Sequence, residues 1–123
     1  MLLADPRFAD AEQKFVSALV KATSGRSPEY PEAVHAAVSA LEEVCREILC
    51  DPKIVLDNAL DRLKNERQLD ANVVEMMKKL YPARGNLDGA AHGAGSGSEH
   101  IARFMIHAVA ASIMYIVSEA AEP

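Results

Sequence analysis

Apolar residues recur along the chain at helical spacing, and no segment shows the strict alternation of a half-buried strand. The clearest run falls between residues 31 and 49, where five apolar positions are spaced 4, 3, 4 and 3 apart: Val34, Val38, Leu41, Cys45 and Ile48. This spacing is typical of a helix that buries one stripe along a neighbouring helix. It predicts a helix over about residues 31–49 in an all-α fold.

Capping signals delimit three further helices. Aspartate followed by proline, an N-cap with proline in the first turn, predicts helix starts at Asp5-Pro6 and Asp51-Pro52. Asp70 is expected to cap another helix, which ends at Tyr81-Pro82, and the first helix is expected to end near residues 23–25. The apolar stripes expected to face inward are Phe8, Phe15 and Leu19 in the first of these helices, Leu56, Leu60 and Leu63 in the second, and Val73, Met77 and Leu80 in the third.

A fifth helix is predicted from Ser98, as its N-cap, to about Ala120, and it is apolar on nearly all sides. A helix of this kind is either central in a bundle or shared with a second copy of the chain, so we expect a homodimer. His100, Arg103 and His107 are spaced 3 and 4 and form one polar stripe on this helix. We expect His107 to be a core histidine, whereas Arg103 suits a surface position and a site equally well.

The bulk composition describes a soluble globular chain. Its length of 123 residues predicts a single domain. Half of the residues are hydrophobic, a quarter are charged, and there is no tryptophan. The net charge of −5 argues against a generally basic nucleic-acid surface but allows a local cationic cleft. The cluster Arg62, Lys64 and Arg67 is interpreted as a solvated helix face mixed with Asp61 and Glu66, in preference to such a cleft.

Several features indicate a cytoplasmic protein. Cys45 and Cys50 are five residues apart on one predicted helix, a poor spacing for a disulfide, and are expected to be free thiols with Cys45 in the core. The first residues have neither the basic region nor the apolar region of a signal peptide. The apolar run over residues 101–117 is short for a bilayer span and is interrupted by Arg103 and His107, so we expect a buried helix and no membrane.

The candidate chemistry lies in a glycine-rich loop over residues 84–98, which contains five of the six glycines of the chain. Such a loop lets a ligand approach the backbone closely, and it leads into a helix start, where unpaired N–H groups favour anions. His92 can exchange protons near neutral pH, Arg84 offers a planar fork for a phosphate, and Asn86 offers uncharged polar groups. The residues expected to contact the substrate beside them are Gly93, Gly95, Ser98, His100 and Arg103.

Sharper motifs are missing from this loop. It lacks the Gly-Lys-Ser/Thr ending of a phosphate-binding Walker loop, and no predicted strand precedes it as a dinucleotide fingerprint requires. The histidines and cysteines match no zinc-ligand spacing, and no Ser-His-Asp set can be assembled. We therefore expect neither a metal nor a cofactor.

Three segments together resemble a known family. They are the helix over residues 33–49, the loop Asn-Leu-Asp-Gly-Ala-Ala-His-Gly over residues 86–93, and the helix start His-Ile-Ala-Arg-Phe over residues 100–104. The combination resembles the C-terminal domain of bacterial abortive-infection proteins, within the HEPN superfamily. The resemblance covers residues 31–119, and the helix within residues 1–25 is an addition to it.

The resemblance implies an antiparallel bundle of about five helices that forms a homodimer, with two copies of the loop across one groove. It also implies a metal-independent ribonuclease in antiphage defence, in which Arg84 steadies the scissile phosphate, Asn86 orients it and His92 acts as general acid or base. The RNA's own 2′-hydroxyl would attack and leave a cyclic phosphate. Gly85 departs from the family pattern, because it places Arg84 eight residues before His92.

A second hypothesis uses the same loop without catalysis. In that case the chain is a helical dimer that senses a ligand or binds a partner in a defence or toxin–antitoxin system. The expected partners are a second copy, RNA, and a cognate antitoxin or defence protein.

Overall fold

The computed structural model describes residues 5–22, 30–81 and 97–120, and all regular structure within these ranges is helical. This confirms the all-α prediction. A short 3-10 helix, η1 (Pro6–Phe8), leads into five α-helices within the described part of the chain: α1 (Ala9–Ala22), α2 (Tyr30–Leu49), α3 (Leu56–Glu66), α4 (Ala71–Leu80) and α6 (Gly97–Ala120).

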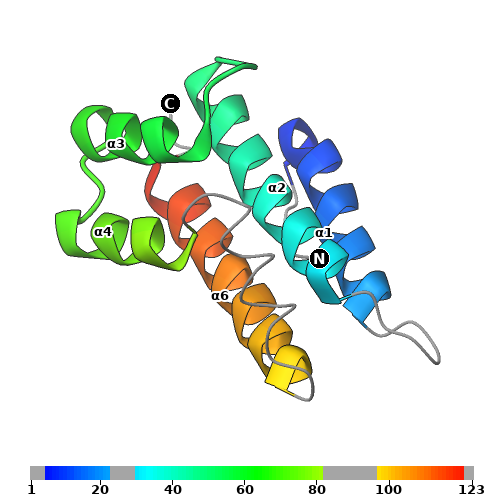
Figure 1. Cartoon of the computed structure of the whole chain (residues 1–123). Helices are drawn as coiled ribbons and strands as arrows, with labels where there is room; N and C mark the ends of the chain where they lie inside the picture. Colours follow the sequence, from blue (N-terminus) through cyan, green and yellow to red (C-terminus); the bar gives the residue numbers. More distant parts are fainter. Residues whose placement is uncertain (1–4, 23–29, 82–96, 121–123) are drawn as a thin grey trace.

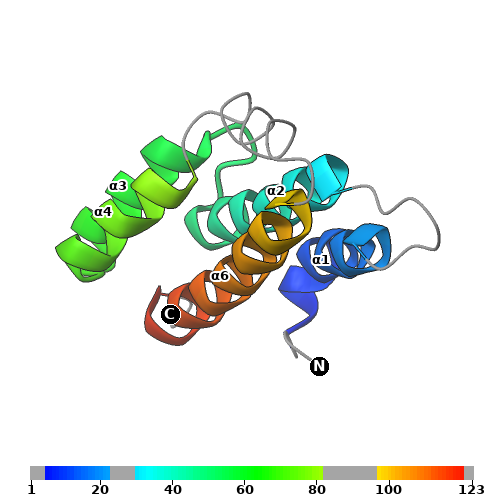
Figure 2. The same ribbon diagram turned by 60° about the horizontal axis from the view of Figure 1, so that its bottom comes forward.

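The long helices α1, α2 and α6 pack together, and α3 and α4 form a pair beside them (Figure 1). In both views the α3–α4 pair and α1 lie on opposite sides of α2 and α6 (Figure 2). Helix α1 runs antiparallel to α2, and Lys14 Nζ lies 3.3 Å from Glu43 Oε2 between them. Helices α2 and α6 instead run in the same direction, so the expected antiparallel arrangement describes only part of the bundle.

One arginine marks the end at which α2 and α6 both finish. Arg67, directly after α3, donates from Nη1 to the carbonyl oxygen of Ala120 at 2.6 Å and from Nη2 to that of Ile48 at 3.5 Å. The last carbonyls of a helix have no partners within the helix and carry the negative end of its dipole. A single guanidinium therefore stabilises two helix ends at once. This contact requires α2 and α6 to end side by side.

Two of the predicted helix starts are confirmed by their hydrogen bonds. The Asp5 carboxylate accepts from the backbone N–H of Arg7 at 2.9 Å, and η1 then continues directly into α1. The Asp70 carboxylate accepts from the N–H groups of Asn72 and Val73 at the start of α4. In both places an acidic side chain satisfies N–H groups that have no partner within the helix.

The predicted start at Asp51-Pro52 is wrong, because α3 begins only at Leu56. Asp51 Oδ1 accepts from the backbone N–H of Lys53 at 3.2 Å, so this carboxylate caps a turn and not a helix. The turn follows Cys50, whose φ of 55° lies in the left-handed region. The N–H groups of Cys50 and Asp51 bond back to the carbonyls of Glu47 and Arg46, which ends α2 in a Schellman motif.

The start of α3 is capped from another helix. Its N-cap residue, Val55, has no side-chain acceptor, and the buried Glu42 on α2 accepts from the N–H of Leu56 at 2.9 Å instead. The other oxygen of Glu42 lies 3.3 Å from Arg46 Nη2, and Arg46 Nε donates to the carbonyl of Ile54 at 2.8 Å. One partly buried ion pair on α2 therefore fixes both the connecting segment and the first turn of α3.

The core confirms most of the predicted stripes. All five seam positions of α2 are buried, as are Leu56, Leu60 and Leu63 of α3. In α1 the buried stripe continues through Ala11 and Ala18, while Leu19 is 43% exposed, which corrects its predicted inward position. In α4 the fully buried residues are Val74 and Met77, and Val73 and Leu80 are only partly buried against the core. Cys45 is buried and Cys50 exposed, and both are free thiols as predicted.

Substitution of Glu42 tests the role of this cap in stability. Glu42→Ala leaves the N–H of Leu56 and the guanidinium of Arg46 without this acceptor, which is expected to lower the free energy of unfolding by about 2–4 kcal/mol. The matched control is Glu43→Ala at the neighbouring position, which removes a more exposed ion pair with Lys14 and is expected to cost under about 1 kcal/mol. Urea denaturation measures both, and equal losses would contradict the assignment.

Candidate functional site

Most of the predicted catalytic loop lies outside the described residues. Arg84, Asn86, His92, Gly93 and Gly95 belong to this group, so their mutual geometry is not part of the structural description. The structure does describe the two points between which the loop runs. These are Tyr81, at the end of α4, and Gly97, at the start of α6.

Tyr81 anchors the end of α4 in the core. Its ring is buried, and its hydroxyl lies 2.9 Å from Ser112 Oγ on α6. Ser112 directs its own proton to the carbonyl of Ala108 at 2.8 Å, so Tyr81 is the donor in the first bond. Burial raises the pKa of the Tyr81 hydroxyl above its usual range. The predicted loop therefore follows a tyrosine whose hydroxyl is uncharged and held by Ser112 of α6.

A second tyrosine, which sequence reasoning missed, ties α6 to the other end of α4. The hydroxyl of Tyr115 accepts a hydrogen bond from the backbone N–H of Asp70 at 3.0 Å. Asp70 is the N-cap of α4, so Tyr115 and Ser112 together hold both ends of that helix. A polar group on a mostly apolar helix was the only sequence signal for either contact.

The start of α6 differs slightly from its prediction. The helix begins at Gly97, so Ser98 lies within its first turn and is not its N-cap. His100 and Arg103 are exposed on the following turns, beside the exposed Phe104. The structure thus establishes the exposure of these two residues of the predicted substrate-binding set.

The predicted core position of His107 is wrong. His107 is exposed, on the same side of α6 as His100 and Arg103. The inward side of α6 is formed instead by a separate stripe that includes Ala102, Ile106, Val109, Ile113 and Ile116. His107 lies on a different side of the helix from this stripe, so the packing of α6 against the bundle leaves it exposed.

The basic cluster on α3 does not form a cationic cleft. Arg62 Nε lies 2.8 Å from Glu66, and its Nη1 lies 3.5 Å from Asp51. Lys64 lies 3.9 Å from Asp61, and Arg67 binds the helix ends described above. This confirms the predicted charged surface for Arg62 and Lys64, which lie beside carboxylates, whereas Arg67 is partly buried against two backbone carbonyls and does not belong to a solvated face.

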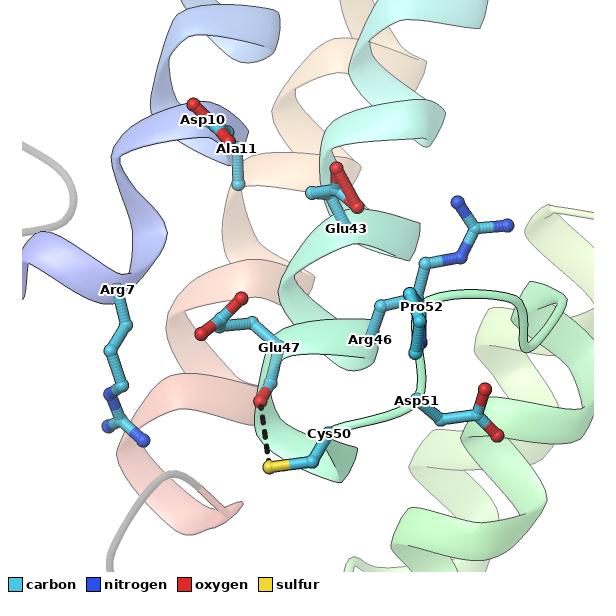
Figure 3. A pocket seen from close by; sticks show the side chains of 9 residues that line it. All are labelled: Arg7, Asp10, Ala11, Glu43, Arg46, Glu47, Cys50, Asp51 and Pro52. Atoms are coloured by element: carbon cyan, nitrogen blue, oxygen red, sulfur yellow. Dashed lines mark hydrogen bonds between the residues drawn. The ribbon is translucent and has the colours of Figure 1, made fainter.

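A cleft of about 370 Å³ opens between α1, the end of α2 and the following turn (Figure 3). Two arginines and four carboxylates line it together with the Cys50 thiol, which donates weakly to the carbonyl of Glu47 at 3.9 Å. The lining residues are Arg7, Asp10, Ala11, Glu43, Arg46, Glu47, Cys50, Asp51 and Pro52. The cleft lies by the C-terminal end of α2, where α6 also ends, and therefore away from the start of α6.

The charges of this cleft largely serve the fold. Glu43 pairs with Lys14, Arg46 with Glu42 and Asp51 with Arg62. Within residues 5–22, 30–81 and 97–120, no group of three histidine, cysteine or acidic side chains could hold a metal ion. The cleft therefore adds no chemistry to the predicted site.

Comparisons with known proteins identify no relative. No protein-family model, curated protein or solved structure matches the chain.

Among the described helices, α6 is long and apolar enough to cross a membrane, over His100–Ala120 with a mean hydropathy of 1.6. In this structure 39% of that window is buried inside the protein, and the core helix of a soluble protein meets the same criterion. The helix also carries the contacts to Tyr81 and Asp70 described above. The side of α6 that carries Ser112 and Tyr115 therefore faces the other helices of the bundle.

The anchor of the loop can be tested by two substitutions of unequal consequence. Tyr81→Phe removes one hydrogen bond and leaves Ser112 bonded to Ala108, so we expect a loss of about 1 kcal/mol in the free energy of unfolding. Ser112→Ala leaves the buried Tyr81 hydroxyl without its acceptor, and we expect a larger loss of about 1–3 kcal/mol. Chemical denaturation of the two variants gives the order, and the reverse order would contradict the assigned donor.

The two thiols are expected to differ in reactivity. Burial, and to a lesser extent the nearby Glu42 carboxylate, raise the pKa of the Cys45 thiol to about 12. At pH 8 only about one Cys45 thiol in ten thousand is therefore ionised. A thiol reagent should modify one cysteine in the native protein and the second only after unfolding. Cys50→Ser is the control and should abolish the native reaction; rapid reaction of both thiols in the native protein would refute the burial of Cys45.

Proposed function

We propose that this protein is a metal-independent ribonuclease of the HEPN kind that acts in antiphage defence. The proposal starts from the resemblance of the loop and its flanking helices to the abortive-infection C-terminal domain. The observation that supports it is the exposure of His100 and Arg103 on the first turns of α6, directly after the loop. An anionic substrate held by the loop would meet these side chains without any rearrangement of the core.

The chemistry assigned to the loop is an internal transesterification of RNA. The 2′-oxygen forms a bond to the adjacent phosphorus, the bond from phosphorus to the 5′-oxygen breaks, and a cyclic phosphate remains. His92 would take the 2′-hydroxyl proton or give one to the departing 5′-oxygen. Arg84 would stabilise the charge on the phosphate, and Asn86 would orient it. Arg103 would add a second cation from α6.

The proposed protein is a cytoplasmic homodimer, with RNA as substrate and a cognate antitoxin or defence protein as a further partner. Its acidic net charge of −5 limits non-specific attraction to RNA. Binding would therefore depend on the local cations, Arg84 and Arg103, more than on the field of the whole molecule.

A non-catalytic binding module is the second candidate. Two observations favour it: the net charge, and the large apolar side chains exposed on α6, Phe104 at 58% and Met114 at 55%. Exposed apolar side chains of this kind are common at protein–protein contacts. In this case the loop would bind a ligand or a partner without turnover.

Cleavage of RNA by the purified protein distinguishes the two candidates. Wild-type protein is incubated with single-stranded RNA in the presence of a chelator, beside His92→Ala and Arg84→Ala. Loss of the proton-transfer group is expected to lower the rate by about 10²–10⁴-fold. Products should end in cyclic phosphate.

The control is His35→Ala, a histidine on α2 outside the loop, which should retain wild-type activity. Equal activity of the wild type and the loop variants would identify a contaminating nuclease and end the catalytic proposal. Absence of cleavage with retained binding of a partner would favour the binding module.

A further inference from the structure

Helix α4 is less firmly packed than the helices at the centre of the bundle. Among the described helices, only α3 has its backbone close to that of α4 at more than isolated points. Two of the ten residues of α4, Val74 and Met77, are buried, whereas half of the twenty residues of α2 are buried apolar side chains. Low apolar burial and few close contacts are the features of a segment that opens locally.

Both ends of α4 are held on α6 by single hydrogen bonds of tyrosine hydroxyls. The hydroxyl of Tyr115 accepts from the backbone N–H of Asp70 at 3.0 Å, before the helix begins. The hydroxyl of Tyr81 lies 2.9 Å from Ser112 Oγ, after the helix ends. The docking of α4 on α6 therefore depends on two point contacts and a small apolar contact between them.

The contacts that order the other helices do not involve α4. Arg67 binds the last carbonyls of α2 and α6, and Glu42 caps α3 from α2. Lys78 on α4 lies 2.9 Å from Asp61 on α3, in an ion pair whose carboxylate side chain is 42% exposed. Helices α1, α2, α3 and α6 can therefore keep their arrangement when α4 leaves α6.

A strained residue lies at the point where such a movement begins. Arg67 is fixed to the two helix ends, and Gln68 directly after it is exposed and has a φ of 59°. The left-handed region is costly for a residue with a Cβ atom and is retained only where the surrounding structure enforces it. Release of α4 lets Gln68 return to an ordinary conformation, so this strain favours opening.

We propose that residues 69–81, with α4 at their centre, are a flap that opens as one unit about Gln68 while the other described helices stay folded. Opening uncovers Ser112 and frees the hydroxyl of Tyr115 on α6. Ten residues are too few for a stable isolated helix, so the open flap loses its helical hydrogen bonds.

Opening also moves Tyr81, the last described residue before the predicted loop, away from α6. A molecule that binds the open form would hold the start of that loop away from α6 by mass action. This control of the loop rests on the proposed function, whereas the opening itself does not.

Native-state hydrogen exchange at increasing urea concentration separates local opening from global unfolding. The amides of Val74, Met77 and Tyr81 should share one opening constant that depends weakly on urea, because opening exposes little surface. The amides of Val38 on α2 and Val109 on α6, called the core amides, should exchange only through global unfolding, with a strong dependence on urea. Equal constants and equal urea dependence in the two groups would overturn the proposal, as would three different constants within the flap.

Substitutions test the same point independently. Glu42→Ala weakens the junction of α2 and α3, which the open flap leaves intact. It should accelerate exchange of the core amides at least about 30-fold and leave exchange of the flap unchanged. Tyr115→Phe removes the acceptor of the Asp70 N–H and should raise the opening constant of the flap about 2–10-fold.

The matched control for Tyr115→Phe is Tyr30→Phe at the start of α2, which should leave flap exchange unchanged. Faster exchange of the flap in Glu42→Ala would show that the flap opens only when the whole protein unfolds. An unchanged opening constant in Tyr115→Phe would show that this tyrosine does not hold the flap. Either result rejects the proposal.

RNA cleavage is measured on the same samples and keeps the flap separate from the proposed ribonuclease. A protein whose flap opens as expected but which cleaves no RNA refutes only the activity. A protein that cleaves RNA in a His92-dependent manner, with a flap that exchanges only through global unfolding, refutes only the flap.

Discussion

Burial of α2 on several sides is the constraint on which the other helices depend. It contacts α1, α3 and α6, and its inward residues include alanines that are fully buried: Ala33, Ala37 and Ala40. Small side chains let neighbouring helices approach closely, and the larger Val34, Leu41 and Val44 fill the space between them. Because α2 is enclosed in this way, α1 and α6 must each present a continuous apolar stripe to it, and only their outer sides are left for function.

Two arginines and one glutamate convert this packing into a defined topology. Arg67 holds the ends of α2 and α6, and the Glu42–Arg46 pair holds the start of α3 and the segment before it. Arg67 and Glu42 satisfy backbone groups that helix geometry leaves without partners, and Arg46 binds the carbonyl of Ile54 in the connecting segment. Apolar stripes alone would allow α6 to pack on α2 in either direction. The polar contacts at the helix ends are specific to the direction observed.

The sequence predicts the helices well and their ends less well, for a physical reason that the α2–α3 connection illustrates. The seam of α2 and the caps Asp5 and Asp70 depend on neighbours within one helical turn, and each of these predictions is confirmed. The same local rule fails at Asp51, because the acceptor for the first turn of α3 comes from Glu42, fourteen residues away from Leu56. A cap supplied by another helix has no local signature.

The same limit explains the outcome at the candidate site. On α6 nearly every side is apolar, and the polar stripe of His100, Arg103 and His107 was the one sequence signal for an outward His107, which the prediction of a core histidine did not follow. The deciding residues are Ser112 and Tyr115, whose partners Tyr81 and Asp70 lie on and beside α4 and fix the rotation of α6 about its axis. Once that rotation is fixed, His100, Arg103, Phe104 and His107 must all face away from α2. The side of α6 that stays exposed is therefore determined by two hydrogen bonds on the side that packs inward.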